Sequence, residues 1–207
     1  MKIVLVSLDW DLIDLIEMHP ELELHGVLDR SLPGLNNGVT MLGADEVWTD
    51  LKKQYPQIKA LFAVDPPKLK EKLAAFYGEE SIVGIISPMA HISKRATVHE
   101  SAIIQHGAKI MPLAKLGKFC KIHINATVHH ESEIGDYSTI APAAQILGNV
   151  KIGKAVYVGA GAVIRQRIKI GDNAVIGAGA VVVADVSDNA CVVGVPADRD
   201  LRLEKKD

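Results

Sequence analysis

The chain has 207 residues, of which 48% are hydrophobic and only 4% aromatic, with a formal net charge of −2. A chain of this length buries roughly 70% of its unfolded surface and folds without a disulfide or a metal, so we interpret Cys120 and Cys191 as reduced thiols of a cytoplasmic protein. No window approaches the roughly 18 apolar residues of a membrane span, and the interspersed charges leave no large basic surface for nucleic acid. The shortage of rings predicts an interior of regularly arranged aliphatic side chains.

The first 84 residues alternate short aliphatic runs with amphipathic stretches. In chain order we predict a strand over 3–6, a helix around 12–16 that ends before Pro20, a strand over 24–28, a Gly/Asn-rich loop over 33–38, a helix over 44–54, a strand over 58–64, and a helix over 66–76 closed by Gly78. Alternation of strands and helices is typical of a parallel sheet. We therefore expect residues 1–84 to form a small α/β domain of the Rossmann-like type.

From residue 86 onward the period changes, because an aliphatic residue recurs at every sixth position. The series is Ile86, Ile92, Val98, Ile104, Ile110, Leu116, Ile122, Val128, Ile134, Ile140, Ile146, Ile152, Val158, Ile164, Ile170, Ile176 and Val182. A smaller residue, most often alanine, stands four positions after each of them. Glycines directly follow the aliphatic residue at 117, 135, 153, 159, 171 and 177, where we expect turns that need a permissive backbone.

A six-residue repeat with one large and one small inward residue predicts a triangular, parallel β-helix. Three hexapeptides make a coil of 18 residues, and coils stack about 4.8 Å apart. The unbroken register over residues 85–187 predicts a β-helix domain without extruded loops, and Asp188 ends the series before a C-terminal segment of residues 188–207. Alanine-sized inward positions exclude aromatic rings, which accounts for the composition.

This pattern resembles the left-handed β-helix acyltransferases with hexapeptide repeats. Over nearly the whole chain it is similar to the sialic acid O-acetyltransferase and nucleotide-aminosugar N-acetyltransferase family, which includes the bacillosamine- and perosamine-pathway acetyltransferases. The resemblance is carried by four segments: Pro67-Lys68-Leu69-Lys70-Glu71-Lys72-Leu73, His130-Glu131-Ser132-Glu133-Ile134-Gly135-Asp136, Gly148-Asn149-Val150-Lys151-Ile152-Gly153 and Val193-Gly194-Val195-Pro196-Ala197.

Six histidines lie between residues 91 and 130, all outside the two inward registers, so we expect them on the surface or in a groove. The resemblance implies that His130 is the general base, because it matches the family's catalytic histidine. It also implies that Glu131 orients the imidazole and that the backbone N–H of Gly148 holds the developing oxyanion. Side chains alternate along a strand, so a pairing of His130 with Glu131 requires a corner between them.

For the acceptor, the resemblance implies a nucleotide-sugar site in the amino-terminal domain, with Ser7, Asp29 and Arg30 as binding residues. The turn after the first strand, Ser7-Leu8-Asp9-Trp10-Asp11, lacks the glycines of the family's phosphate-binding turn and adds two carboxylates. His123 and Thr139 stand where the family has an asparagine and a second histidine. We expect both to contact substrate.

For acetyl-CoA, the resemblance implies a groove between neighbouring β-helices of a homotrimer, along coils that carry Gly159, Gly161 and Gly177. The predicted function is acetyl-CoA-dependent N-acetylation of a nucleotide-linked deoxyaminosugar in bacterial surface-glycan synthesis, without a metal. Direct attack on the thioester is expected, because Cys120 occupies an inward position and cannot act as a nucleophile.

Three alternatives stay open at this point. A sugar O-acetyltransferase of the sialic-acid type would use the same base. A non-catalytic β-helix binding protein is favoured by the missing glycine-rich turn. A γ-type carbonic anhydrase would need three histidines on zinc, but the spacing of His123, His129 and His130 places them on successive faces.

Overall fold

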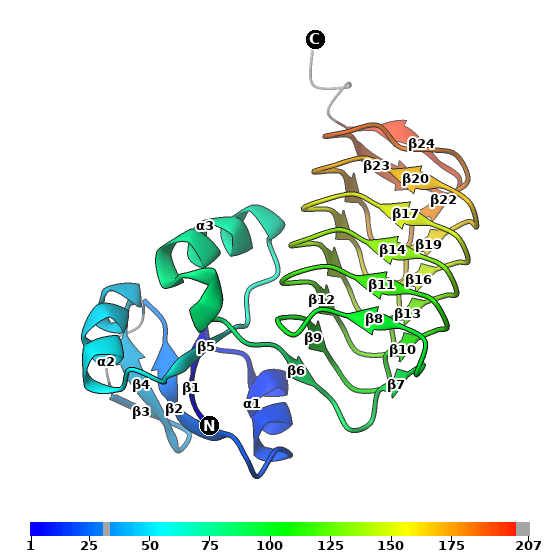
Figure 1. The fold of residues 1–207 in the computed structure, drawn as a ribbon. Helices are drawn as coiled ribbons and strands as arrows, with labels where there is room; N and C mark the ends of the chain where they lie inside the picture. The colour runs from blue at the N-terminus through cyan, green and yellow to red at the C-terminus, as the bar shows by residue number, and fades with distance from the viewer. Residues whose placement is uncertain (31–33, 202–207) are drawn as a thin grey trace. The chain divides into compact units, whose positions relative to one another are not determined.

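The computed structural model describes residues 1–30 and 34–201. The chain divides into two compact units, Met1–Asp65 with Leu69–Ile85 and Pro66–Lys68 with Ile86–Asp207. The first unit holds the α-helices of the described residues, apart from Pro67 and Lys68 at the start of the last one, and the second is built mainly of short strands wound into coils (Figure 1).

The first unit is built on one sheet with the strand order β3-β4-β2-β1-β5. Its strands are β1 (Lys2–Val6), β2 (Glu23–Leu28), β3 (Gly34–Asn36), β4 (Val39–Gly43) and β5 (Lys59–Phe62). The strands β4, β2, β1 and β5 run parallel, and β1 lies between β2 and β5. Ile3, Val4 and Leu5 of β1 have no exposed surface, as expected for a central strand covered on both faces.

Helix α1 (Trp10–Glu17) connects β1 to β2, and α2 (Trp48–Gln54), which follows a 3₁₀ turn at Asp45–Val47, leads from β4 to β5. Helix α3 (Pro67–Tyr77) follows β5. Asp9 caps α1 by accepting the N–H of Leu12 at 3.1 Å. The predicted loop over 33–38 is wrong in part, because β3 and β4 pair antiparallel as a hairpin. Asn37 and Gly38, both at positive φ, supply its tight turn. Pro33 lies outside the described residues.

The second unit is a parallel β-helix with three sheets, one for each face (Figure 1). The six-stranded sheet holds β7 (His91–Ile92), β10 (Lys109–Ile110), β13 (Thr127–Val128), β16 (Gln145–Ile146), β19 (Val163–Ile164) and β22 (Val181–Val182). The five-stranded sheet holds β8 (Thr97–Val98), β11 (Lys115–Leu116), β14 (Glu133–Ile134), β17 (Lys151–Ile152) and β20 (Lys169–Ile170). The eight-stranded sheet holds β6 (Ile85–Ile86), β9 (Ile103–Ile104), β12 (Lys121–Ile122), β15 (Thr139–Ile140), β18 (Tyr157–Val158), β21 (Val175–Ile176), β23 (Cys191–Gly194) and β24 (Ala197–Asp200).

The interior of the β-helix follows the predicted hexapeptide register. Side chains from Ile104 to Val182 in the aliphatic series are 0–4% exposed, and the alanines of the small register lie among them. Cys120 is buried in this register, as expected, with its thiol 3.2 Å from the carbonyl of Gly135. Ser138 replaces alanine there, donates to the Gly153 carbonyl at 2.9 Å and accepts the Val156 N–H at 3.0 Å. Polar residues therefore enter the small register where they join successive coils.

The expectation that glycine supplies the permissive turn backbone is wrong for the glycines that follow the aliphatic residue. Positive φ falls two residues later in the hexapeptide, at positions such as Phe119, Glu131 and Tyr137. The glycines serve a different need, because the next coil passes too close for a side chain. A Cβ on Gly135 would lie 2.5 Å from the carbonyl carbon of Gly153.

The two ends of the β-helix depart from the regular register. Ile86 is 40% exposed, so the first member of the aliphatic series does not share the burial of the later ones. After Val182 the chain shortens one coil by two residues, so that Ile170 bridges to Val186. The core continues through Val186, Ala190 and Val192 beyond the predicted end at residue 187. The β24 strand then pairs antiparallel with β23.

Candidate active site

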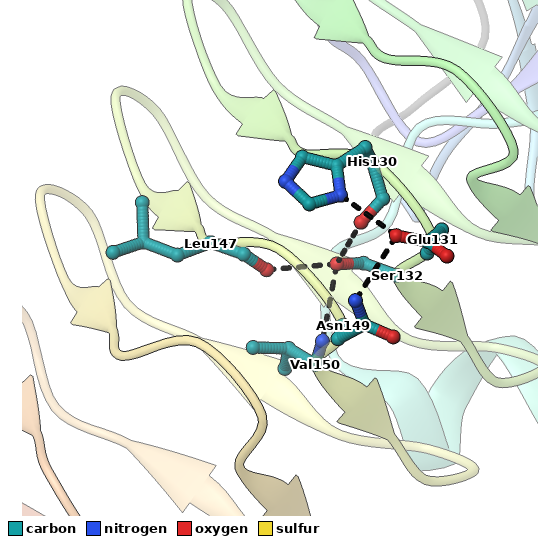
Figure 2. A network of polar contacts seen from close by, with 6 residues as sticks. All are labelled: His130, Glu131, Ser132, Leu147, Asn149 and Val150. Carbon is teal, nitrogen blue, oxygen red and sulfur yellow. Dashed lines mark hydrogen bonds and ion pairs between the residues drawn. The ribbon is translucent and has the colours of Figure 1, made fainter.

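His130 and Glu131 stand at the corner between β13 and β14. Glu131 adopts φ 59°, so the chain turns at that residue and both side chains project from the same corner. The imidazole Nδ1 lies 3.0 Å from Oε2 of Glu131 (Figure 2). The pairing predicted from the sequence therefore exists, and it is made by the corner that alternation required.

Asn149 completes this pair from the next coil. Its side-chain amide donates to the same Oε2 of Glu131 at 3.1 Å (Figure 2). Hydrogen bonds from His130 and then from Asn149 hold the pKa of the Glu131 carboxyl below its usual range. An ionised carboxylate only accepts hydrogen bonds, so Nδ1 of the neutral imidazole carries the proton and Nε2 is left as a base.

No role was predicted for Asn149. The available signal was its position, since one coil is 18 residues and Asn149 lies 18 residues after Glu131. Stacking thus places the amide directly beside the carboxylate, and the Asn149 N–H donates to the carbonyl of His130 at 3.0 Å.

Gly148 lies against the imidazole. A Cβ at this position would stand 2.6 Å from both Cε1 and Nε2 of His130, so only glycine leaves room for the ring as it is placed. At the same hexapeptide position, the N–H groups of Lys118 and Lys154 are capped by Asp136 and Asp172. Within the described residues the N–H of Gly148 has no such acceptor, which leaves it available to bind an oxyanion.

Ser132 fixes the backbone that carries Gly148. Its side chain is fully buried, and its hydroxyl donates to the Leu147 carbonyl at 2.8 Å. The same oxygen accepts the N–H of Val150 at 3.2 Å (Figure 2). The segment from Leu147 to Val150 is therefore held on both sides of Gly148 by one buried side chain.

A second group of predicted residues gathers in the α/β unit. Ser7, Asp29 and Arg30 line a cavity of about 310 Å³ at the carboxyl ends of β1 and β2, with Val64 just beyond β5. The chain leaves β1 for β2 and β4 and returns to β5 on the other side of β1. Such a reversal of strand order is where open α/β sheets bind ligands.

The turn between β1 and α1 is closed by the chain's own carboxylates. Asp29 accepts the N–H of Leu8 at 3.0 Å and the hydroxyl of Ser7 at 3.4 Å. Ser7 adopts φ 71°, a left-handed backbone that glycine would take without strain. Three donors at this turn, the Ser7 hydroxyl and the N–H groups of Leu8 and Leu12, therefore already face the carboxylates of Asp29 and Asp9.

The other predicted site residues are dispersed. His123 is 9% exposed and Thr139 has no exposed surface, so the expectation that all six histidines are accessible is wrong for His123. An outward position can itself be covered, as neighbouring Lys121 also shows. The contacts of His123 and Thr139 with substrate stay predictions.

The predicted glycines of the acetyl-CoA groove lie on a different edge of the β-helix from Gly148. Gly159 and Gly161 form the corner between β18 and β19, and Gly177 begins the same corner one coil later. Gly161 takes φ 66° with open space around it, whereas Gly159 and Gly177 closely approach the next coil. One copy of the chain therefore does not bring these glycines to His130.

The described residues contain neither a membrane-spanning helix nor a cluster of metal ligands. None of the helices is long and apolar enough to cross a membrane. No cluster of three or more histidine, cysteine, aspartate or glutamate side chains is arranged to hold a metal ion in the described ranges.

Comparison with known proteins places these features in context. The model for bacterial transferase hexapeptide (six repeats) matches residues 133–166 and 149–184. A GDP-perosamine N-acetyltransferase of Escherichia coli O157:H7 is 31% identical over 132 residues, which are 60% of this chain and 58% of that protein. The match thus spans less than two thirds of the length of this curated relative.

Two solved structures match almost end to end. PerB from Caulobacter crescentus, in complex with CoA and GDP-perosamine, has a TM-score of 0.88 and 25% identity over 97% of each chain. WeeI from Acinetobacter baumannii AYE has a TM-score of 0.87 and 27% identity, covering 97% of this chain and 100% of that one. The sheets, the repeats and these neighbours fit a left-handed β-helix. They confirm the resemblance to the nucleotide-aminosugar N-acetyltransferases that the sequence indicates.

Proposed function

We propose that this chain is an acetyl-CoA-dependent N-acetyltransferase that acts on the amino group of a nucleotide-linked deoxyaminosugar. The observation that carries the proposal is the hydrogen-bonded chain Asn149–Glu131–His130 next to the uncapped N–H of Gly148. Support comes from the relatives, one of which is a GDP-perosamine N-acetyltransferase and another of which was solved with CoA and GDP-perosamine.

The arrangement supplies each element of direct acyl transfer. Nε2 of His130 takes a proton from the acceptor amine while the amine nitrogen attacks the thioester carbonyl carbon. The carbonyl oxygen becomes an oxyanion that accepts the N–H of Gly148. When the carbon–sulfur bond breaks, the imidazolium returns the proton to the thiolate, and the products are CoA and the N-acetyl sugar.

Glu131 and Asn149 act on this reaction through His130. The carboxylate fixes the tautomer with its proton on Nδ1 and stabilises the imidazolium as it forms. Asn149 keeps the carboxylate in place and ionised. Neither residue needs to touch the substrate.

In the α/β unit, which we take to be a Rossmann-like nucleotide-sugar domain, the cavity beside Ser7, Asp29 and Arg30 is the proposed place for the nucleoside. Gly159, Gly161 and Gly177 lie on another edge from Gly148, so a donor groove that uses both edges needs a second copy of the chain. This requirement supports the homotrimer that the resemblance implies.

A substrate screen tests the proposal. The purified chain is incubated with acetyl-CoA and GDP-, UDP- or dTDP-linked amino sugars, while thiol release and product mass are measured. We expect an acetyl amide that survives hydroxylamine. A hydroxylamine-labile ester on a sugar would instead favour O-acetylation, and CoA binding without turnover on any acceptor would favour the non-catalytic binder.

A further inference from the structure

The edge of the β-helix that carries His130 also concentrates positive charge. This His130 edge consists of the corners 93–95, 111–113, 129–131, 147–149, 165–167 and 183–185, which connect the six-stranded to the five-stranded sheet. Backbone hydrogen bonds join its corners in sequence, from Leu113 N–H to the Arg95 carbonyl through to Arg167 N–H to the Gly148 carbonyl.

Two basic corners lie on this edge at equal offsets from the candidate catalytic corner. Lys94 and Arg95 come 36 residues before His130 and Glu131, and Arg167 comes 36 residues after Glu131, with Arg165 beside it. Because each coil advances about 4.8 Å, both corners lie roughly 10 Å along the edge from His130, in opposite directions. All four cations are exposed.

The charge is specific to this edge. Corners between the five- and eight-stranded sheets alternate in sign, with Glu100, Lys118, Asp136, Lys154 and Asp172 in succession. Corners between the eight- and six-stranded sheets, from 87–89 to 177–179, carry no lysine, arginine, aspartate or glutamate.

The four cations are not balanced by neighbouring carboxylates. In the described part of the chain, no aspartate or glutamate lies within ion-pair distance of Lys94, Arg95, Arg165 or Arg167. The nearest acid along the edge beyond Arg167 is Asp185, whose carboxylate accepts the N–H of Lys169 at 2.8 Å. Unpaired guanidinium groups on an exposed corner are suited to bind phosphate oxygens.

In the α/β unit, by contrast, the Ser7 hydroxyl and the Leu8 N–H face Asp29, and the Leu12 N–H faces Asp9. Three donors after β1 are therefore directed at carboxylates of the protein. Both substrates of the proposed reaction carry a diphosphate, and each must bring its reacting end to His130. The edge has one cationic corner on each side of His130, so each corner can bind the diphosphate of one substrate while the two reacting ends meet at His130.

We infer, on the basis of the proposed function, that the Arg165–Arg167 corner binds the phosphates of acetyl-CoA and the Lys94–Arg95 corner binds the diphosphate of the acceptor. The position of Gly148 decides which substrate lies on which side of His130 along this edge. Its N–H receives the thioester oxygen, and it lies between His130 and Arg167, so the donor occupies that side of the edge. The acceptor then lies on the opposite side, past Leu113, which is 52% exposed.

The test uses two double variants that serve as controls for each other, R165Q/R167Q and K94Q/R95Q. For R165Q/R167Q we expect the KM for acetyl-CoA to rise about tenfold or more, with the acceptor KM and kcat unchanged. For K94Q/R95Q we expect the acceptor KM to rise about tenfold or more, with the KM for acetyl-CoA and kcat unchanged. With acetyl-pantetheine, a donor without the diphosphate, R165Q/R167Q should match the wild type.

Calorimetric titration with CoA and with the nucleotide sugar gives a second readout that needs no turnover. Unchanged affinities in both double variants would overturn the inference while leaving the N-acetyltransferase proposal in place. An equal loss with acetyl-pantetheine would show that Arg165 and Arg167 do not act on phosphate, and exchanged effects would overturn the assignment of sides. Wild-type protein that binds both ligands but acetylates no amino sugar would contradict the proposed function alone.

Discussion

Replacing Gly148 by alanine places a methyl carbon 2.6 Å from Cε1 and Nε2 of His130. Favourable contact between such atoms begins at roughly 3.5 Å, so the ring must retreat by about 1 Å. A displacement of that size costs on the order of 100-fold in rate when it affects a positioned catalytic group. We therefore expect Gly148→Ala to lower kcat/KM about 100-fold, equivalent to roughly 2.7 kcal/mol of transition-state stabilisation.

The substitution keeps the backbone N–H, so it separates clearance for the ring from oxyanion binding. The His130 side chain is 58% exposed and can swing into solvent, so the free energy of unfolding should change by less than about 1 kcal/mol. Steady-state acetyl transfer and denaturant unfolding measure the two quantities. In a His130→Ala background there is no ring to displace, and Gly148→Ala should then have little further effect. A fully active Gly148→Ala enzyme, or additive losses in the double variant, would refute the reasoning.

Three further predictions concern Gly135 in the β-helix and the two residues that act through His130, Glu131 and Asn149. Gly135→Ala should lower the free energy of unfolding by about 1–3 kcal/mol, because its Cβ would meet the backbone of Gly153. The control Gly161→Ala has nothing within 4 Å of its Cβ and should lower the free energy of unfolding by only about 1 kcal/mol, through backbone strain. Denaturant titration measures both, and a larger loss for Gly161→Ala than for Gly135→Ala would contradict the clearance argument. Glu131→Gln should lower kcat about tenfold with the acceptor KM unchanged, a smaller loss than for His130→Ala, and equal kcat values for Glu131→Gln and wild type would exclude a role for the charge. Asn149→Ala removes a hydrogen bond that lowers the Glu131 pKa, so the Glu131 carboxyl should be protonated at a higher pH than in the wild type; NMR titration of that carboxyl measures the change, and an unchanged Glu131 pKa would show that Asn149 does not hold the carboxylate ionised.

The sequence predicted the β-helix well because a period of six is repeated over many coils, and each repeat supports the same interpretation. Ile104 to Val182 are buried as that period requires. The ends were harder to predict. Ile86 fits the pattern but is 40% exposed, and the two-residue contraction before Val186 leaves the period while keeping the core.

The glycines show why the position of a glycine in the sequence does not by itself reveal its role in a turn. A glycine next to a predicted turn indicates either unusual φ or close approach, and the sequence does not distinguish them. Only the structure shows that Glu131, Phe119 and Tyr137 take the left-handed backbone while Gly135 leaves room for the next coil. The β3–β4 hairpin was missed for a related reason, because its strands are short and lie beside a turn signal at Asn37 and Gly38.

The candidate site was partly predictable from the stacking of coils. The pairing of His130 with Glu131 could be anticipated from the corner, and the same 18-residue offset leads from Glu131 to Asn149. The closure of the turn after β1 by Asp29 could not be anticipated, since it depends on how β1 and β2 align.

The central claim is that His130 is the base for acetyl transfer from acetyl-CoA to the amine of a nucleotide-linked sugar. The most direct measurement compares CoA release by wild type and His130→Ala, both confirmed as folded, on whichever GDP-, UDP- or dTDP-linked amino sugar the wild type accepts. We expect a loss of about 10²–10⁴-fold in kcat, with the affinity for CoA retained. A His130→Ala protein that acetylates the sugar at the wild-type rate would contradict the account.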